Sequence, residues 1–388
     1  MESLSRAPNA MDGLERVDSL WFSDGNIVIC AHNVLFRVYK GILTARSPVF
    51  AEMLAFPQSE DADTVDGCPV LHLDDHHQKR EIVMIASDTM YFLKALFDYE
   101  FFAPYPAKTD FDAIHGILRL GQKYRVEPLR RRALQHLSSA HPTTLNAWDV
   151  LCTSSSKSQF ASPSNAFPGG ASFDYDNLEL PILTLARAAR ADWILPAAFY
   201  RALAVLGSAE ILDGIDYTGV HIELDRADKV VCLEAAPVLL GDSISEMLGF
   251  LWTPEAIPGC ARAGASSSTT SLASTGSATS ATDTQTINAC TADRLAMRRT
   301  AERWRRDGLL PLSLGAGPGE EERAIWAEED FARLAVCAPC LAYMRADWAA
   351  RRANFWAGLP ALFGLPGWEA LEQARAEGEG RVVEDVRA

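Results

Sequence analysis

The first third of the chain changes from a strand pattern to a helix pattern, and this change constrains the fold more than any other sequence feature. The pair Asp24-Gly25 separates two apolar runs and predicts a hairpin, because both positions of a two-residue turn must reach positive φ at low cost. Residues 34–39, which are rich in β-forming side chains, follow a second reversal at residues 31–33. From Ser47-Pro48 onward, apolar residues recur at helical spacing. Two or three strands followed by successive helices predict an α+β domain with helices on one side of a small sheet.

The rest of the sequence has a mainly helical pattern and divides by composition. After the α+β domain at residues 17–140, residues 177–258 predict a helical middle region and residues 291–375 a helical C-terminal region. Residues 261–288 are low-complexity Ser, Thr, Ala and Gly, which cannot bury enough apolar area to offset chain entropy. We therefore expect a disordered linker there, and a flexible leader over residues 1–16.

Length and composition predict a soluble intracellular protein. The 388 residues are enough for two or three domains. No uninterrupted apolar run reaches the roughly 20 residues that a membrane helix needs, and no apolar region typical of a secretory signal follows Met1. The eight cysteines are scattered, which favours reduced thiols over a disulfide framework. We expect a cytoplasmic or nuclear location and no membrane partner.

The charge balance argues against a nucleic-acid partner. The chain carries 36 Lys and Arg against 51 Asp and Glu, a formal net charge of -15. The field of such a chain repels a polyanion. No zinc-finger or helix-turn-helix signature is present either. We therefore expect protein partners.

Several segments, taken in order, resemble a BTB/POZ domain, and they are most similar to the large BTB group of mushroom-forming fungi. The segments are residues 18–29, 35–54, 66–73 and 118–134, with weaker similarity at 193–200 and 355–368. Within them, Leu43, Ser47 and Phe50 match the Leu-x-x-x-Ser-x-x-Phe helix of the family.

The resemblance implies a small sheet flanked by helices, followed by a mainly α-helical C-terminal region. It also implies a non-catalytic module that binds other proteins or a second copy of itself. Relative to the family, residues 78–90 are an insertion and predict a loop. A substrate adaptor of a cullin-type ubiquitin ligase is the alternative within this family. The apolar-x-Glu triplet that such adaptors often carry is absent before Glu60.

Leu20, Trp21 and Phe22 are the candidate partner interface. Large apolar side chains near an exposed sheet edge suit an interface. The alternative is that the three side chains pack under the helices of the domain. The sequence leaves both interpretations open.

Two chemical motifs stand out in the second half of the chain. Residues 238–244 resemble the Gly-Asp-Ser turn of one esterase family, which makes a hydrolase the second alternative function. A serine nucleophile needs a base, and no histidine follows His221, so we expect no enzyme here.

The second motif is Cys337-Ala-Pro-Cys340, whose spacing lets two thiolates bind one Zn²⁺. A closed zinc site needs four ligands, and Cys260 and Cys290, which flank the low-complexity segment, are the candidates for the other two. A long flexible loop between ligands adds little closure entropy. The alternative is that these cysteines are buried free thiols. The predicted cofactor is therefore a structural zinc ion or none.

Overall fold

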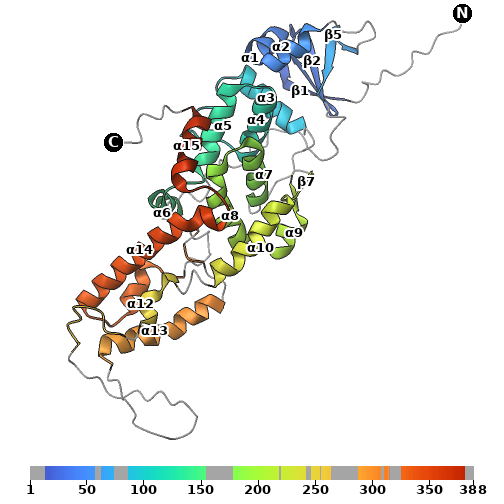
Figure 1. The fold of residues 1–388 in the computed structure, drawn as a ribbon. Coiled ribbons are helices and arrows are strands. Elements are labelled where there is room, and N and C mark those ends of the chain that lie inside the picture. Colours follow the sequence, from blue (N-terminus) through green and yellow to red (C-terminus); the bar gives the residue numbers. More distant parts are fainter. Residues whose placement is uncertain are drawn as a thin grey trace, which may run out of the picture.

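The computed structural model describes residues 14–56, 63–73, 86–153, 178–217, 220–241, 246–253, 255–263, 287–306, 310–312, 314 and 325–380. The chain is mixed α+β, with a small sheet at one end and helices over the rest of its length (Figure 1). This confirms the coarse fold class. The predicted linker lies almost wholly outside the described residues, as does the leader up to residue 13. Residues 15 and 16 already belong to the first strand.

The sheet has five strands in the order β1-β3-β2-β5-β4. They are β1 (Glu15–Trp21), β2 (Ile27–Ala31), β3 (Val34–Val38), β4 (Thr64–Val65) and β5 (Cys68–His72). β2 is antiparallel to β3 and parallel to β5, and β1 is parallel to β3. β1 is therefore an edge strand, and the predicted patch at Trp21 begins at that edge.

The hairpin predicted at Asp24-Gly25 is wrong. Its turn exists, because the Gly25 amide donates to the Phe22 carbonyl oxygen at 3.0 Å, but the strands on either side do not pair with each other. The actual hairpin joins β2 to β3 at the second predicted reversal, where His32 adopts a φ of 53°. Gly25 has no positive φ. Glycine fits there because an added Cβ would lie 3.1 Å from the Val38 carbonyl oxygen.

Leu43, Ser47 and Phe50 do not lie in one helix as the family motif suggests. They occupy two short helices, α1 (Lys40–Arg46) and α2 (Pro48–Ala55), with Ser47 between them. Ser47 caps α2 by accepting a hydrogen bond from the Phe50 amide at 3.1 Å, and it donates to the Tyr124 carbonyl oxygen at 2.6 Å. The Phe50 ring also stacks on Tyr124, with ring centroids 4.3 Å apart. The serine thus joins α2 to the later helices of the domain.

We expect Ser47→Ala to lower the free energy of unfolding by about 1–3 kcal/mol, because it removes a helix cap and leaves a buried carbonyl oxygen without its donor. Urea unfolding followed by circular dichroism measures the loss. Thr44→Ala is the matched control, since the Thr44 hydroxyl bonds only to Gly41 within its own helix. Equal stability of the Ser47→Ala variant and the wild type would contradict the role assigned to this hydroxyl.

Three further helices complete the N-terminal part: α3 (Ala86–Phe97), α4 (Phe111–Lys123) and α5 (Glu127–Ser139). Asp110 caps α4 by accepting a hydrogen bond from the Ala113 amide at 2.7 Å. Residues 86–90 form the first turns of α3, so the loop predicted over 78–90 is wrong for that part. The side chains from Met90 to Leu93 are all buried. Their apolar contacts stabilise α3 and extend it toward its N-terminus, into the segment predicted to be a loop.

The remaining described chain is mainly helical. Its elements are α6 (Leu145–Thr153), α7 (Glu179–Ala189), η2 (Asp192–Ile194), α8 (Leu195–Val205), α9 (Ser208–Asp213), β6 (Ile215–Tyr217), β7 (Val220–Ile222), α10 (Arg226–Leu240), α12 (Gly249–Trp252), α13 (Ala289–Arg306), η3 (Glu328–Arg333), α14 (Ala338–Leu362) and α15 (Trp368–Glu379). The small β6–β7 hairpin is an addition to the helical middle region that the sequence predicts. None of the described helices combines the length and the apolarity needed to cross a membrane.

The described chain has two hydrophobic cores that include helices, besides a small cluster of buried residues on one face of the sheet at Val28, Cys30, Leu35, Val65, Cys68 and Val70. The larger one runs from Val17 on β1 to Leu371 on α15, so the sheet and the last helices share one core. The smaller one surrounds α12 and the N-terminal ends of α13 and α14. In Figure 1 this second core lies at the end of the molecule opposite the sheet.

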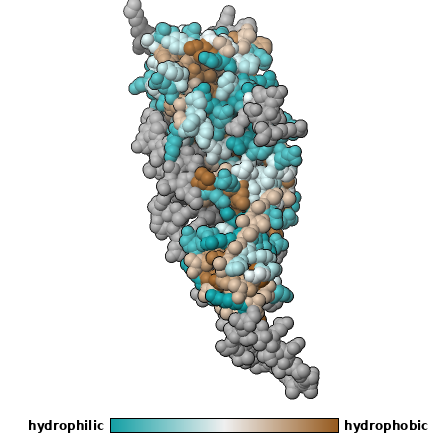
Figure 2. Space-filling view, turned by 90° about the vertical axis from the view of Figure 1, so that its left-hand side faces the viewer, coloured by the Kyte–Doolittle hydropathy of each residue, from teal (hydrophilic) through white to brown (hydrophobic). Residues whose placement is uncertain are grey.

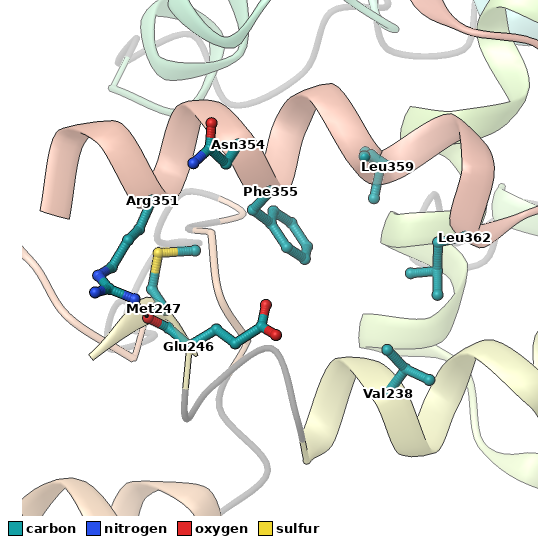
Figure 3. Close-up of a pocket in the computed structure, with 9 residues that line it drawn as sticks. Val238, Glu246, Met247, Arg351, Asn354, Phe355, Leu359 and Leu362 are labelled. Atoms are coloured by element: carbon teal, nitrogen blue, oxygen red, sulfur yellow. Dashed lines mark hydrogen bonds between the residues drawn. The ribbon is translucent and has the colours of Figure 1, made fainter. Parts of the chain in front are cut away.

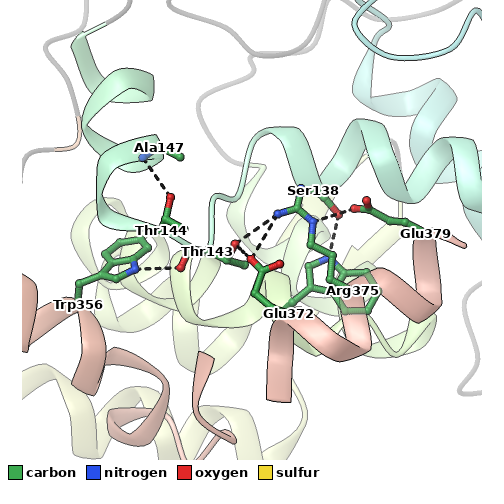
Figure 4. Close-up of polar contacts among 9 residues, drawn as sticks. Ser138, Thr143, Thr144, Ala147, Trp356, Glu372, Arg375 and Glu379 are labelled. Carbon is green, nitrogen blue, oxygen red and sulfur yellow. Dashed lines mark hydrogen bonds and ion pairs between the residues drawn. The ribbon is translucent and has the colours of Figure 1, made fainter. Parts of the chain in front are cut away.

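Polar contacts fasten the last two helices to the N-terminal part (Figure 4). The Trp356 indole donates to the Thr143 carbonyl oxygen at 3.1 Å, and the Arg375 guanidinium donates to the Thr143 hydroxyl at 3.3 Å. The Trp193 indole donates to the Ser138 hydroxyl at 2.8 Å. The bond between Trp356 and Thr143 joins residues that are 213 positions apart in the sequence.

A buried histidine beside this junction predicts acid sensitivity. Burial lowers the pKa of His141 to about 4, because the charged imidazolium loses its hydration. Between pH 6.5 and pH 4 the unfolded chain therefore binds a proton that the folded chain does not, and stability falls as the pH falls. The loss attributable to His141 is about 2 kcal/mol between pH 7 and pH 5. Urea titrations at the two pH values measure it, and His141→Gln should lack this part of the loss. An equal loss in both proteins would contradict the assignment.

Candidate metal centre

Four cysteine thiols from three segments of the chain converge on one point. Cys260 follows α12 in a turn, Cys290 lies in the first turn of α13, and Cys337 and Cys340 lie at the start of α14. All four sulfur atoms lie within 4.8 Å of one another. The cluster is thus positioned to bind a metal ion, and it contains the four cysteines that the sequence indicates.

Helix starts explain how the sequence builds this cluster. The Asn288 side chain accepts from the Thr291 amide at 2.9 Å and so fixes the start of α13 beside Cys290. Cys337 is the N-cap of α14, and Pro339 occupies its first turn, where the missing N–H costs nothing. Residues three apart on one turn lie on the same side of a helix, which brings the Cys337 and Cys340 thiols together.

The sulfur positions fit tetrahedral coordination. Sulfur atoms held about 2.3 Å from a central Zn²⁺ lie about 3.8 Å from each other in a tetrahedron. The Cys260 and Cys337 sulfur atoms are 3.9 Å apart. The Cys337 amide also donates to the Cys290 sulfur at 3.3 Å, an arrangement that stabilises a thiolate. The residues present therefore fit a metal ion bound by four thiolates.

The protein environment favours one thiolate in particular. The backbone amide of Cys340 donates to the Cys337 sulfur and lowers the pKa of Cys337 to about 6. Burial raises the pKa of Cys290 and of Cys340 instead, because a buried sulfur resists ionisation in the absence of a cation. A metal ion would favour the ionised form of these thiols instead, since a thiol releases its proton when it binds a metal. Of Cys290, Cys337 and Cys340, Cys337 is thus the thiol that ionises most readily.

The smaller core encloses the inner side of the cluster. Cys290 and Cys340 are buried in it with Phe250, Trp326 and Phe331, whose rings are in contact with one another. Cys260 and Cys337 are partly exposed and form the outer side. A metal bound here would lie between a packed aromatic core and the surface.

Sequence reasoning missed one residue of this environment. Arg294 is only 1% exposed, and its guanidinium donates to the carbonyl oxygens of Phe250 and Glu255. The sequence feature that could have indicated its role is its position four residues after Cys290, which places both side chains on one side of α13. Because arginine is usually a surface residue, the sequence pattern alone favoured a solvated face.

The three residues of the predicted interface differ in how exposed their side chains are. Leu20 is 1% exposed and belongs to the larger core, so its assignment to a surface is wrong. Phe22 is half-buried against the rings of Tyr39 and Phe97, at centroid distances of 5.0 and 5.7 Å. Trp21 is half-buried beneath the guanidinium of Arg16, 4.5 Å from its ring. Alternation along an edge strand places Leu20 inward and Trp21 outward.

A cavity of about 460 Å³ lies between α10 and α14 (Figure 3). Apolar side chains from α10 and α14 meet the polar groups of Glu246 and Arg351 there. Arg351 is bound to Asp347 and to the Glu246 carbonyl oxygen, each at 2.6 Å. Asp242 and Ser243 of the Gly-Asp-Ser motif lie outside the described residues. None of the described lining residues is a histidine.

Comparison with protein-family models, with curated proteins and with solved structures finds no match to this chain.

Proposed function

We propose that this chain is a non-catalytic protein-binding scaffold whose C-terminal helices are held by a structural zinc ion. The observation that carries the proposal is the convergence of four thiols. Structural zinc sites have four protein ligands, whereas catalytic sites keep one position open for water or substrate. With four cysteines around one point, no position remains for a reactant. The ion would hold α13, α14 and the turn at Cys260 in place.

Zinc analysis of the purified full-length chain tests this proposal. We expect about one zinc ion per chain, as a closed four-thiolate site requires. Cys290→Ser should lose the ion, because it removes a buried ligand, and Cys152→Ser should keep it, because Cys152 lies on α6 away from the cluster. Iron is the alternative ion, since tetrahedral sulfur sites also suit it, and the same analysis distinguishes the two. Wild-type protein that binds neither ion would overturn the proposal.

The protein-binding part of the proposal concerns the N-terminal region, which we propose to be a BTB/POZ-like domain. Its support is the sequence resemblance, together with a small sheet that has α1 and α2 between its third and fourth strands and α3 to α5 after its last strand. The binding surface that we propose consists of Met53 and Phe56 around the end of α2, which are 36% and 73% exposed. Trp21 at the free edge of β1 lies on the opposite face of the sheet, packed against the small cluster at Val28 and Cys30, and would form a separate contact. On the face shown in Figure 2, apolar residues form separate patches, so we expect a local contact.

Gel filtration with light scattering tests the binding role. We expect the purified chain to self-associate, and Phe56→Ser to weaken the association, because a largely exposed phenylalanine gains most from being covered. Tyr99→Ser is the matched control, as Tyr99 is 85% exposed on the segment after α3. A strict monomer that also binds no protein partner would count against the scaffold. Direct binding to a purified cullin would favour the adaptor alternative, and failure to bind would remove it.

A further inference from the structure

A fully buried arginine lies beside the cysteine cluster and forms no close ion pair with a carboxylate of the described residues. Arg294 is 1% exposed. Its guanidinium donates to the Phe250 carbonyl oxygen at 2.6 Å, to the Glu255 carbonyl oxygen at 2.7 Å and to the Thr291 hydroxyl at 3.4 Å. Its Nε has no hydrogen-bond partner among the residues that the structure describes. Uncharged oxygens thus satisfy part of the hydrogen bonding of Arg294 and none of its charge.

A buried positive charge of this kind needs a negative partner. Taking an isolated ion out of water costs several kcal/mol, and the cost is recovered only where an opposite charge lies close. Cys340, Cys260 and Cys290 lie close enough to act electrostatically on Arg294, and the Glu255 carboxylate acts on it more weakly than any of them. Protonated thiols carry no charge and cannot balance a guanidinium.

The metal-loaded cluster supplies the missing charge. One Zn²⁺ with four thiolates has a net charge of about -2. The N-termini of α13 and α14, where Cys290, Cys337 and Cys340 lie, direct partial positive charge toward the sulfur atoms. Arg294 adds a full charge from the inner side, which the smaller core shields from water. The two helix ends and the guanidinium together match the negative charge of a loaded site.

We propose that Arg294 is the counter-ion of the metal-loaded cysteine cluster and raises the metal affinity of the cluster through its charge. The proposal rests on the metal site proposed above. It explains a buried guanidinium that hydrogen bonds alone leave uncompensated. It assigns Arg294 a positioning role, in which the residue acts on the ion through the four sulfur ligands.

Two substitutions separate the charge of Arg294 from its hydrogen bonds. Arg294→Lys keeps the positive charge, and Arg294→Gln keeps amide donors without the charge. Metal affinity is measured on the full chain by titrating Co²⁺ and following its absorption with thiolate ligands, and then by displacing the Co²⁺ with Zn²⁺. We expect Arg294→Gln to bind about 10–100-fold more weakly than the wild type, the range typical of lost outer-shell partners. Arg294→Lys should recover most of the affinity. The control is Arg298→Gln, because Arg298 is exposed one turn later on the same helix.

The outcomes distinguish the proposed role of Arg294 from the proposed metal site on which it rests. Wild-type protein that binds neither Co²⁺ nor Zn²⁺ would overturn the metal site and Arg294's role with it. Tight binding by both wild type and Arg294→Gln would overturn only the role of Arg294. If Arg294→Lys is impaired as strongly as Arg294→Gln, the residue acts through its shape, and the charge argument is wrong. Circular dichroism of each metal-free variant shows whether the fold itself has changed.

Discussion

Removing the metal with a chelator is expected to unfold the smaller core while the larger core stays folded. The smaller core is formed by three segments, around α12, α13 and the first half of α14, that meet at the four thiols. A core of this size supplies little net stability by itself, because chain entropy offsets most of the burial. Structural zinc contributes about 10–16 kcal/mol of binding free energy, and that free energy is available only in the folded state.

Hydrogen exchange read by mass spectrometry measures this effect segment by segment. After chelation, we expect amide exchange to become fast in α12, α13 and residues 338–344. Exchange in α4 and α5 should stay slow, since both helices belong to the larger core. Re-addition of Zn²⁺ should restore protection, and Cys152→Ser should behave like the wild type throughout. Unchanged protection of α13 in metal-free protein would show that the apolar contacts of the smaller core suffice.

The sequence was most informative where local chemistry determines structure. Cysteines are rare ligands with specific spacing requirements, so the Cys337-x-x-Cys340 pair and its two partners could be proposed from the sequence, and the structure brings them together. Ser47-Pro48 was a recognisable helix start because capping depends on a neighbour three residues away. Each of these features is local in sequence or carries its own chemical signature.

The features that sequence reasoning missed depend on distant partners. The parallel pairing of β1 with β3 follows from packing across the whole sheet, whereas the Asp24-Gly25 pattern predicted the nearest antiparallel pairing. Leu20 and Trp21 could be separated into an inward and an outward side chain only after the edge strand was known. The burial of Arg294 depends on carbonyl oxygens of Phe250 and Glu255, which lie about forty residues away. Patterns of neighbouring residues do not contain these pairings.

Trp356→Ala is expected to destabilise the larger core by about 3–5 kcal/mol, the range for truncating a buried aromatic side chain. Trp356 is 5% exposed on α14. Its ring stacks on Trp368 with centroids 5.2 Å apart, and it lies 5.5 Å from the ring of Trp148. The substitution also leaves the Thr143 carbonyl oxygen without its donor. Urea unfolding followed by circular dichroism measures the loss, and Tyr343→Ala on the same helix is the control, since Tyr343 is 46% exposed.

The same variant shows how far the larger core acts as one unit. Because Trp356 packs against α6 and α15, and α15 contacts α5, we expect its loss to speed hydrogen exchange in α4 and α5 as well as in α14. Tyr343→Ala should leave all of these helices protected, because exposed side chains contribute little to stability. If Trp356→Ala loosens α14 alone and the exchange of α4 and α5 stays as in the wild type, then the N-terminal part folds without the last helices. Coupled loosening would instead mean that an event at this part of α14 reaches α4 and α5 through α15.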